Sequence, residues 1–533
     1  MPQTQAMGSP RVSHRPQARR RILCVFPRYA PSFGTFQHGY ALIPGVRAFM
    51  PPQGLLVIAA YLPKEWEVRF IDENIRLPSE ADYRWADAVL MSGMHIQRPR
   101  IQRINEAAHR HGKLTVLGGP SVSASPECYP DVDVLHLGEL GDATDALIEF
   151  LDRETARPAG QRVFATAERL GLEEFPIPAY GLIDMRRYML ASIQFSSGCP
   201  YRCEFCDIPA LYGRRPRLKS APRILAELDA IRAAGAQGAV YFVDDNFIGN
   251  PKATRELLPH IIQWQRDRGY PLSFACEATL NIAQWSDILE QMRTAKFHSI
   301  FCGIETPEPE GLQFMHKEQN LRQPLIDAVR KINGYGMELV AGIILGLDTD
   351  TRQTVDRVLA FIDESKIPML TINLLYALPK TPLYDRLRAE HRLTEDTTRV
   401  SNIVFRMPYA EVVSMWQRCI AEAYDPLRLF ERFAHQTEVT FPHRLSAPLN
   451  PTPEQLLRGL NILSRVMWSV GVCADYRGTF WRLAGPLLRA GRIEEIINMG
   501  VIARHLIRFT REALAGRGEA CFYAEQGADV LAP

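Results

Sequence analysis

One pattern repeats from about residue 21 to residue 375: a short apolar run followed by a longer stretch with helical periodicity. Continuous apolar runs of this length indicate strands that are buried on both faces, and such strands belong to parallel sheets covered by helices. The pattern therefore restricts most of the chain to α/β architectures.

The first group of apolar runs predicts an N-terminal doubly wound parallel sheet over residues 21–155. A disordered arm is expected before it, over residues 1–20, because that segment has several Arg, no acid and few apolar side chains. The expected strands of the sheet lie in the runs 22–26, 54–62, 68–71, 88–91, 114–117 and 132–137.

The second group of runs predicts a partial TIM-like (βα)6 barrel over residues 188–400, with ligands at the C-terminal ends of its strands. A linker over residues 156–187 is expected to precede it, because Pro176 and Pro178 favour an extended backbone. The expected barrel strands are 192–196, 239–243, 272–275, 299–303, 339–345 and 369–374.

Strand signals fade after about residue 400, so residues 401–533 are predicted to form a helical C-terminal domain. Its expected helices are 411–424, 453–470 and 494–514. Residues 482–517 contain seven Arg and three acids among apolar pairs, a composition that suits either a helix lying on an anionic bilayer or a helix packed on the barrel. The second interpretation has the better base rate.

Composition excludes several classes of protein. A chain of 533 residues with 46% apolar and 23% charged residues is expected to be globular and to have about three domains. The net charge of +2 gives no field for nucleic acid, and no run reaches the length of a spanning helix. The N-terminal segment lacks the apolar core of a signal peptide, and ten cysteines are too dilute for a disulfide scaffold. We therefore expect a cytoplasmic protein, with peripheral contact at the inner face of the membrane left open.

Three of the cysteines are clustered. Cys199, Cys203 and Cys206 follow an expected strand with the spacing Cx3CxxC, which allows one short loop to hold three irons of a four-iron cluster. A zinc loop is the alternative, but structural zinc usually takes a second cysteine pair nearby, and Cys276 and Cys302 are isolated on expected strands.

This spacing, with an aromatic residue just before the last cysteine, resembles the signature of the radical S-adenosylmethionine (SAM) enzymes. The resemblance implies a [4Fe–4S] cluster whose fourth iron binds the amino and carboxylate groups of SAM. It also implies SAM contacts at the matching strand ends. These candidate contacts are Phe205, Asp244, Glu305, Gly342 and Gly346. The family usually continues the fifth strand with Pro-Gly-Glu, and this chain has Asp348-Thr349-Asp350 instead.

The N-terminal sheet has glycines at the C-terminal ends of three expected strands, the edge at which open sheets bind ligands. A structural adapter, a nucleotide-binding domain and a cobalamin-binding domain are the alternatives, and the absence of GxGxxG weakens the second. The arrangement resembles the cobalamin-binding domains that precede many radical SAM barrels. The candidate cobalamin contacts are Ser92, Gly93, His95, Gly118, Gly119, Ser121, Gly138 and Glu139.

The chain lacks the DxHxxG string of proteins that ligate cobalt through histidine. His95 is the nearest candidate for a cobalt ligand, although a pocket or core histidine is the more common interpretation. Cobalamin is therefore expected to bind without a histidine ligand on cobalt.

Segments 33–36, 49–54 and 195–214, together with the helical C-terminal region, resemble the bacterial hopanoid C-2 methylases. The resemblance implies that SAM cleavage yields a 5′-deoxyadenosyl radical, which removes hydrogen from an unactivated carbon. Methylcobalamin then supplies the methyl group, and a second SAM restores it. The implied substrate is an apolar hopanoid such as diploptene, methylated at C-2 of ring A, and the implied electron donor is a protein such as ferredoxin or flavodoxin. No general base is nominated.

Two alternatives share parts of this pattern. A related enzyme that methylates a phosphinate, a polyketide or a peptide, or that closes a ring, would carry the same cofactor motifs. A non-catalytic cobalamin sensor would carry the sheet but has no use for the cysteine triplet.

Overall fold

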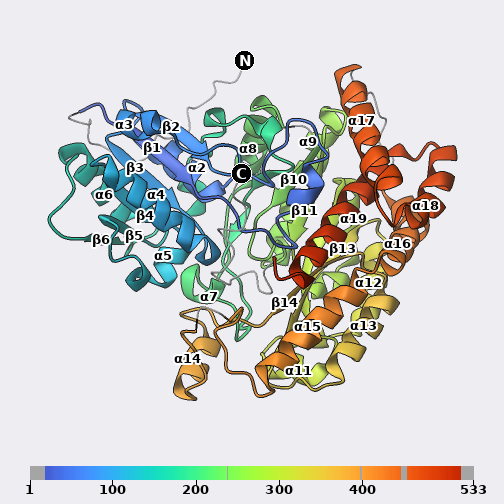
Figure 1. Cartoon of the computed structure of the whole chain (residues 1–533). Helices are drawn as coiled ribbons and strands as arrows, with labels where there is room; N and C mark the ends of the chain where they lie inside the picture. Colours follow the sequence, from blue (N-terminus) through green and yellow to red (C-terminus); the bar gives the residue numbers. More distant parts are fainter. Residues whose placement is uncertain (1–17, 237, 397–398, 446–452, 518–533) are drawn as a thin grey trace. The chain divides into compact units, whose positions relative to one another are not determined.

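The computed structural model describes residues 18–236, 238–396, 399–445 and 453–517. The chain divides into two compact units. Figure 1 draws the whole chain, coloured along its sequence. Unit 1 comprises Met1–Arg28 and Pro52–Asp184, and unit 2 comprises Tyr29–Pro51 and Met185–Pro533. Residues 1–17 of the expected arm lie outside the described residues. Arg20 is described, and its Nε donates to the backbone oxygen of Leu151 at 2.9 Å.

Unit 1 contains a six-stranded sheet in the order β2-β1-β3-β4-β5-β6, with every neighbouring pair parallel. This confirms the doubly wound parallel sheet. Helices α3 (Glu80–Trp85), α4 (Arg98–Arg110), α5 (Pro120–Ala124) and α6 (Asp142–Arg153) connect its strands. The strands are β1 (Arg21–Phe26), β2 (Glu67–Asp72), β3 (Ala88–Ser92), β4 (Leu114–Gly118), β5 (Val134–Leu137) and β6 (Arg162–Ala165).

Two elements of unit 1 differ from expectation. The run 54–62 is not a strand but lies in helix α2 (Gln53–Tyr61), because a continuous apolar run that is buried nearly all round has the same appearance in a helix as in a strand. The sixth strand, β6, comes from the segment expected to be a linker. β6 is at the edge of the sheet and is mostly exposed, so it does not need the apolar run that marks the other strands.

Unit 2 contains six parallel strands in the order β14-β13-β12-β11-β10-β7, which confirms the partial barrel. Helices α8 (Ala221–Ala233), α9 (Pro251–Asp267), α10 (Ser286–Thr294), α12 (Leu325–Asn333) and α13 (Thr354–Ser365) lie between successive strands. The strands are β7 (Ala191–Ile193), β10 (Gly238–Phe242), β11 (Leu272–Glu277), β12 (Phe297–Glu305), β13 (Glu338–Leu345) and β14 (Met369–Leu374). A short antiparallel pair, β8 (Ser196–Ser197) and β9 (Arg217–Leu218), follows β7.

Helices continue unit 2 after the barrel, and the three expected ones are present. They are α15 (Tyr409–Ala423), α17 (Pro453–Val466), which continues as the π-helical η10 (Met467–Val472), and α19 (Ile493–Leu514). Helices α14 (Pro382–Ala389), α16 (Pro426–His435) and α18 (Arg477–Arg489) were not expected. In the described part of the chain, no helix is long and apolar enough to cross a membrane.

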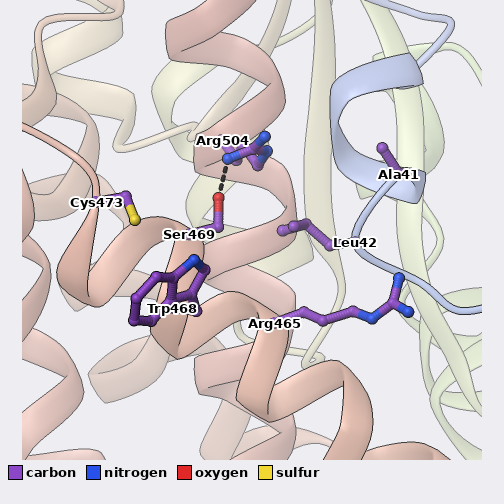
Figure 2. Close-up of a pocket in the computed structure, with 7 residues that line it drawn as sticks. All are labelled: Ala41, Leu42, Arg465, Trp468, Ser469, Cys473 and Arg504. Atoms are coloured by element: carbon purple, nitrogen blue, oxygen red, sulfur yellow. Dashed lines mark hydrogen bonds between the residues drawn. The ribbon is translucent and has the colours of Figure 1, made fainter.

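Helix α19 is the centre of this helical region, and most of its apolar side chains are buried. This burial favours a basic helix that packs on the protein over one that lies on a bilayer. The short helix α1 (Gln37–Tyr40), from the excursion 29–51 between β1 and α2, packs on it. A pocket of about 400 Å³ lies beside α1, α17–η10 and α19 (Figure 2). Its lining residues are Ala41, Leu42, Arg465, Trp468, Ser469, Cys473 and Arg504.

Candidate active site

The three clustered cysteines lie in one loop of unit 2, between β8 and α7 (Ile208–Leu211). The backbone N–H of Cys199 donates to Gly213 at 3.2 Å, and that of Cys206 donates to the oxygen of Cys203 at 3.1 Å. Burial raises the pKa of the Cys199 and Cys206 thiols, and the neighbouring thiols of the triplet raise it further. A metal that binds this loop must therefore displace protons from the thiols.

Asp244 and Asp245, which follow β10, both accept hydrogen bonds from the backbone that leads into this loop. Asp244 accepts from Phe195, at 3.2 Å, and from Ser196. Asp245 accepts from the N–H of Gly198 at 2.6 Å. Burial raises the pKa of Asp244 to about 7, although the backbone hydrogen bonds oppose the rise. These contacts place Asp244 beside the loop as a backbone anchor, and its contact with SAM stays a prediction.

A buried ion pair lies at the end of β12, where Glu305 contacts the ammonium of Lys317. Glu305 and Lys317 are 7% and 5% exposed. A Cβ on Gly303 would overlap the Glu305 carboxylate and lie 2.6 Å from Lys317 Nζ, so any larger residue at this strand position would have to displace the ion pair. Lys317 Nζ also lies 5.5 Å from the centre of the Phe205 ring, which links the ion pair to the cysteine loop.

Gly342 and Gly346 lie on and just after β13, next to this ion pair. Gly342 is the register partner of Gly303, and a Cβ there would lie 3.6 Å from Glu305 Oε2. The N–H of Gly346 donates to Asp350 Oδ2 at 2.7 Å. The structure thus brings Phe205, Glu305 and Gly342 together around the loop, while Gly346 belongs to the turn that Asp350 closes.

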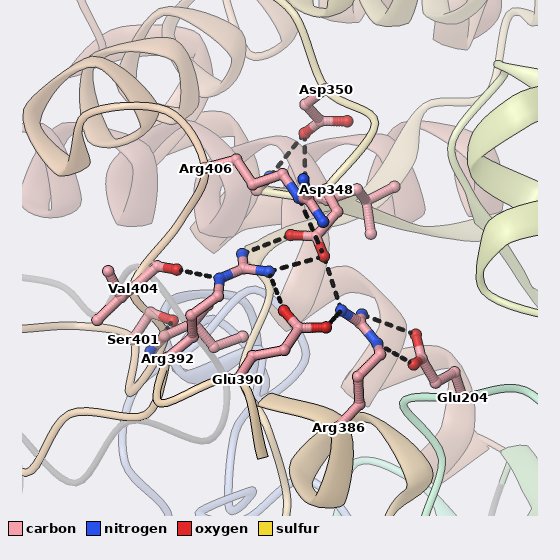
Figure 3. A network of polar contacts seen from close by, with 12 residues as sticks. Glu204, Asp348, Asp350, Arg386, Glu390, Arg392, Ser401, Val404 and Arg406 are labelled. Carbon is pink, nitrogen blue, oxygen red and sulfur yellow. Dashed lines mark hydrogen bonds and ion pairs between the residues drawn. The ribbon is translucent and has the colours of Figure 1, made fainter. Parts of the chain in front are cut away.

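Asp348, at the position where the sequence departs from Pro-Gly-Glu, is the centre of an ion-pair network (Figure 3). It pairs with Arg386 at 2.8 Å and Arg392 at 2.5 Å. Burial would raise its pKa, but the hydrogen bonds from the two arginines lower the pKa to about 2. Arg386 also forms two hydrogen bonds with Glu204, which lies between Cys203 and Phe205, so the network joins the cysteine loop to α14.

The glycine-bearing strand ends of unit 1 gather at one edge of its sheet. Ser92 and Gly118 are register partners at the ends of β3 and β4. Gly119 has φ +94°, and a Cβ there would overlap the Ser92 hydroxyl, so only glycine suits this turn. Beyond β5, the N–H of Gly138 donates to the Ser123 hydroxyl at 2.9 Å. These ends lie next to the switch point between β1 and β3, where open sheets bind ligands.

The remaining unit 1 candidates have partners of their own. Ser121 Oγ and Tyr129 Oη are 2.6 Å apart, and Glu139 pairs with Arg169 at 3.2 Å. A Cβ on Gly93 would lie 3.0 Å from Ile101 Cδ1, so the backbone of Gly93 packs closely on α4.

His95 lies in the short 3-10 helix η1 (His95–Gln97), just before α4. Burial, with the neighbouring Arg98, lowers the pKa of His95 to about 3. An Arg98 nitrogen lies 2.7 Å from His95 Nε2, so this ring nitrogen already has a hydrogen-bond partner in the protein. The imidazole is therefore neutral and paired, and its role as a cobalt ligand stays a prediction.

Comparison with known proteins extends these observations to the whole chain. Residues 42–148 match the B12 binding domain, residues 193–362 match the Radical SAM superfamily, and residues 381–518 match a domain of unknown function, DUF4070. A protein of Rhodopseudomonas palustris named hopanoid C-2 methylase is 53% identical over 97% of this chain and 98% of its own length. The chain belongs to this family of cobalamin-binding radical SAM methylases.

Two further comparisons agree with the family assignment. An uncharacterized methyltransferase of Synechocystis sp. is 35% identical to this chain over 88% of each. A solved structure of OxsB, described as a cobalamin-dependent SAM radical enzyme, superposes with a TM-score of 0.59 and 16% identity over 93% of this chain and 80% of its own. This second likeness confirms the fold.

The methylase uses a [4Fe–4S] cluster, SAM and cobalamin. Its cysteine loop fits the cluster, since it offers three thiols and leaves one iron for another ligand. Among the described residues, no three His, Cys, Asp or Glu side chains converge tightly enough to hold a single metal ion. A four-iron cluster does not require three side chains to converge on one point, because each thiolate binds a different iron. The residues that hold each cofactor are proposed below.

Several residues near the loop had no signal in the sequence. Gln319 Nε2 donates to Cys203 Sγ at 3.3 Å, and Lys317 pairs with Glu305. Both come from the segment after α11 (Pro309–Phe314), which carries no motif. Glu204 follows Cys203 and Asp245 follows Asp244, and an acid next to a candidate site residue is the one sequence signal that could have indicated an anchoring role.

Proposed function

We propose that this enzyme methylates C-2 in ring A of a hopanoid. The observation that carries the proposal is the 53% identity, over nearly the full length of both chains, to a relative whose name states that activity. Substrate specificity depends on a pocket formed by many side chains, so identity at this level over the whole chain supports a shared substrate far better than the cofactor motifs do.

The proposed cluster ligands are Cys199, Cys203 and Cys206. When bound, the cofactors supply radical hydrogen abstraction from an unactivated carbon and a methyl group for that carbon. The chain's own contribution is placement and exclusion of water. Glu305, held by Lys317, is proposed to orient the polar end of SAM, and Gly303 and Gly342 leave room beside that carboxylate.

The proposed cobalamin site is the glycine-bearing edge of the unit 1 sheet. Gly118, Gly119 and Gly138 leave the backbone accessible there, and Ser92 and Gly93 end the neighbouring strand. Nε2 of His95 is engaged by Arg98, which supports binding of cobalamin without a histidine ligand on cobalt.

Two partners follow from this chemistry. Radical SAM enzymes require a reductant, and we propose a small electron-carrier protein such as ferredoxin or flavodoxin. A hopanoid is apolar and resides in membranes, so we also propose that the enzyme meets its substrate at the inner membrane surface.

The test is the lipid profile of a hopanoid-producing bacterium that makes no 2-methylhopanoids. Expression of the wild-type chain should add one methyl group to ring A of a fraction of the hopanoids, located by mass spectrometry of ring-A fragments. The Cys203→Ala variant, expressed at the same level, should leave the profile unchanged.

The lipid profile could stay unchanged in cells that express the wild-type chain, although the protein purified from those cells cleaves SAM. That result would show that the substrate is different. Methylation in another ring would retain the reaction class and overturn the C-2 assignment.

A further inference from the structure

A group of exposed apolar side chains lies on α17, η10 and α18 of unit 2. Fifteen large apolar side chains of the described residues are exposed, and seven of them fall between Leu456 and Leu488. Six of the seven make up what we call the C-terminal apolar surface. They are Leu456 (54% exposed), Leu457 (68%), Leu460 (61%), Trp468 (66%), Val472 (52%) and Trp481 (40%).

These side chains lie on helical segments that contact one another, α17 with η10 and α18 with η10. Leu456 and Leu460 are four residues apart on α17, and Trp468 and Val472 are four residues apart on η10, so the members of each pair are neighbours on the helix surface. Trp481 joins them from α18, because its Nε1 donates to the oxygen of Gly471 at 2.9 Å. Exposed apolar groups gathered in this way, rather than scattered singly, mark an interaction surface.

The charge around this surface is strongly one-sided. Residues 453–489 contain five Arg and no Lys, against Glu454 and Asp475 as the only acids, whereas the whole chain has a net charge of only +2. Asp475 is paired with Arg511 at 2.9 Å, which offsets its charge. The surroundings of the apolar surface therefore favour an anionic partner.

The pocket described above borders this surface (Figure 2). Trp468 belongs to both, and Arg465 and Arg504 line the pocket together with Ser469. Arg504 donates to the Ser469 hydroxyl. Arginine and serine side chains can donate hydrogen bonds to an anionic headgroup. An exposed tryptophan prefers the interface of a bilayer, which is where the headgroups are, so the two features suit the same partner.

We propose that the C-terminal apolar surface docks the enzyme on a bilayer that contains anionic phospholipid, with a headgroup in the pocket between Arg465 and Arg504. A second copy of the chain fits less well, because pairing two such surfaces would bring two arginine-rich regions together. The proposal stands on this surface alone and holds whichever membrane lipid is the substrate.

The test measures sedimentation of the anaerobically reconstituted holoenzyme with vesicles. We expect it to bind vesicles of equal parts phosphatidylcholine and phosphatidylglycerol, and to bind pure phosphatidylcholine weakly. The double variant Leu457→Glu/Leu460→Glu should reduce binding about tenfold or more, since two apolar anchors become anions. The matched control is Leu77→Glu, at a site with 54% exposure in unit 1, which should bind as the wild type does.

The pocket has its own variant. Arg465→Gln should weaken binding to the anionic vesicles several-fold and leave weak binding to phosphatidylcholine unchanged, whereas Arg266→Gln on α9 should change neither. Basal SAM cleavage should be the same in all these variants, which shows that each one is folded.

Three results would overturn the proposal. The wild-type enzyme could fail to sediment with the anionic vesicles, or the double variant could sediment as well as the wild type does. Light scattering could also reveal a dimer that the double variant dissociates, which would make the surface an interface between copies of the chain.

Discussion

At the scale of single residues, the site depends on a charged pair in a place with little spare volume. Glu305 and Lys317 are both buried, so each ion requires the other to compensate its lost hydration. Gly303 leaves room for the pair in this geometry, because a Cβ at that position would displace the carboxylate and the ammonium.

Gly303→Ala should therefore reduce SAM cleavage about tenfold to a hundredfold, which corresponds to about 1.4–3 kcal/mol of overpacking transmitted to the ion pair. The rate of 5′-deoxyadenosine formation measures this effect, with iron content as the check that the cluster is still present. Gly334→Ala is the control, since a Cβ there would make only ordinary contacts at 3.4–3.5 Å. Equal rates for the Gly303 variant and the wild type would refute this role of the pair.

His505 gives a second prediction at this scale. It is fully buried on α19, its Nε2 lies 3.1 Å from the oxygen of Phe33, and burial, followed by the nearby His38, lowers its pKa to about 3. The unfolded chain therefore binds a proton between about pH 6.5 and 3 that the folded chain does not bind, so the free energy of unfolding falls as the pH falls through that range.

At pH 5.5 this one residue should cost about 1.4 kcal/mol relative to pH 7.5. Thermal or urea unfolding at the two pH values should show a decline that is smaller by about that amount in His505→Gln. A decline of the same size in both proteins would show that His505 does not contribute to the pH dependence.

At the scale of elements, the cysteine loop is held from two sides. Asp245, after β10, accepts the N–H of Gly198 before the first cysteine, and Arg386 on α14 binds Glu204 between the second and third. Asp348 completes the second anchor through Arg386. An anchor on each side should hold the loop in its cluster-binding shape.

Arg386→Gln should weaken this anchor by about 1–3 kcal/mol, because it leaves the Glu204 carboxylate without its charged partner. We expect reconstituted protein to lose iron to a chelator several-fold faster than the wild type. Arg386→Lys should give an intermediate rate, since lysine restores the charge but not the two parallel hydrogen bonds. Identical rates of iron loss in all three proteins would remove Glu204 and Arg386 from this role.

Elements were predictable from the sequence where the signal is local. Five of the six barrel strands are largely apolar runs of five to nine residues, and all six expected segments overlap a strand of the structure, although β7 has only three residues. Helix α2 was misread because its apolar run fits both periods, and β6 was missed because an exposed edge strand needs few apolar residues. The same holds for the site. The cysteine spacing is a local pattern and could be predicted, whereas the contacts of Lys317 and Arg386 join distant parts of the sequence and could not.

At the scale of the whole molecule, the two sets of cofactor candidates belong to different units. The glycine-bearing strand ends are in unit 1, and the cysteine loop and the Glu305–Lys317 pair are in unit 2. The excursion Tyr29–Pro51 interrupts unit 1 and belongs to unit 2, where Phe33 packs on Phe509 of α19 with ring centroids 4.6 Å apart. The segment 33–36, known from the sequence only as a family resemblance, thus contributes to the helical region.

Separate units predict separable cofactors. Cys199→Ala, Cys203→Ala or Cys206→Ala should each abolish SAM cleavage while the protein still binds cobalamin. Absorbance of the protein-bound corrinoid and assay of 5′-deoxyadenosine measure the two properties on the same sample. SAM cleavage retained in any of the three variants would contradict the assignment of that ligand.

The central claim is that this chain transfers a methyl group to C-2 of a hopanoid with both cofactors. The most direct measurement incubates the anaerobically reconstituted enzyme with diploptene, a reductant and SAM labelled in its methyl group, and quantifies every product. We predict labelled 2-methyldiploptene, with 5′-deoxyadenosine and S-adenosylhomocysteine each formed in equal amount to it, because one SAM is cleaved and a second supplies the methyl group. SAM cleavage without any labelled hopanoid, under conditions where cluster and cobalamin are both bound, would contradict the account.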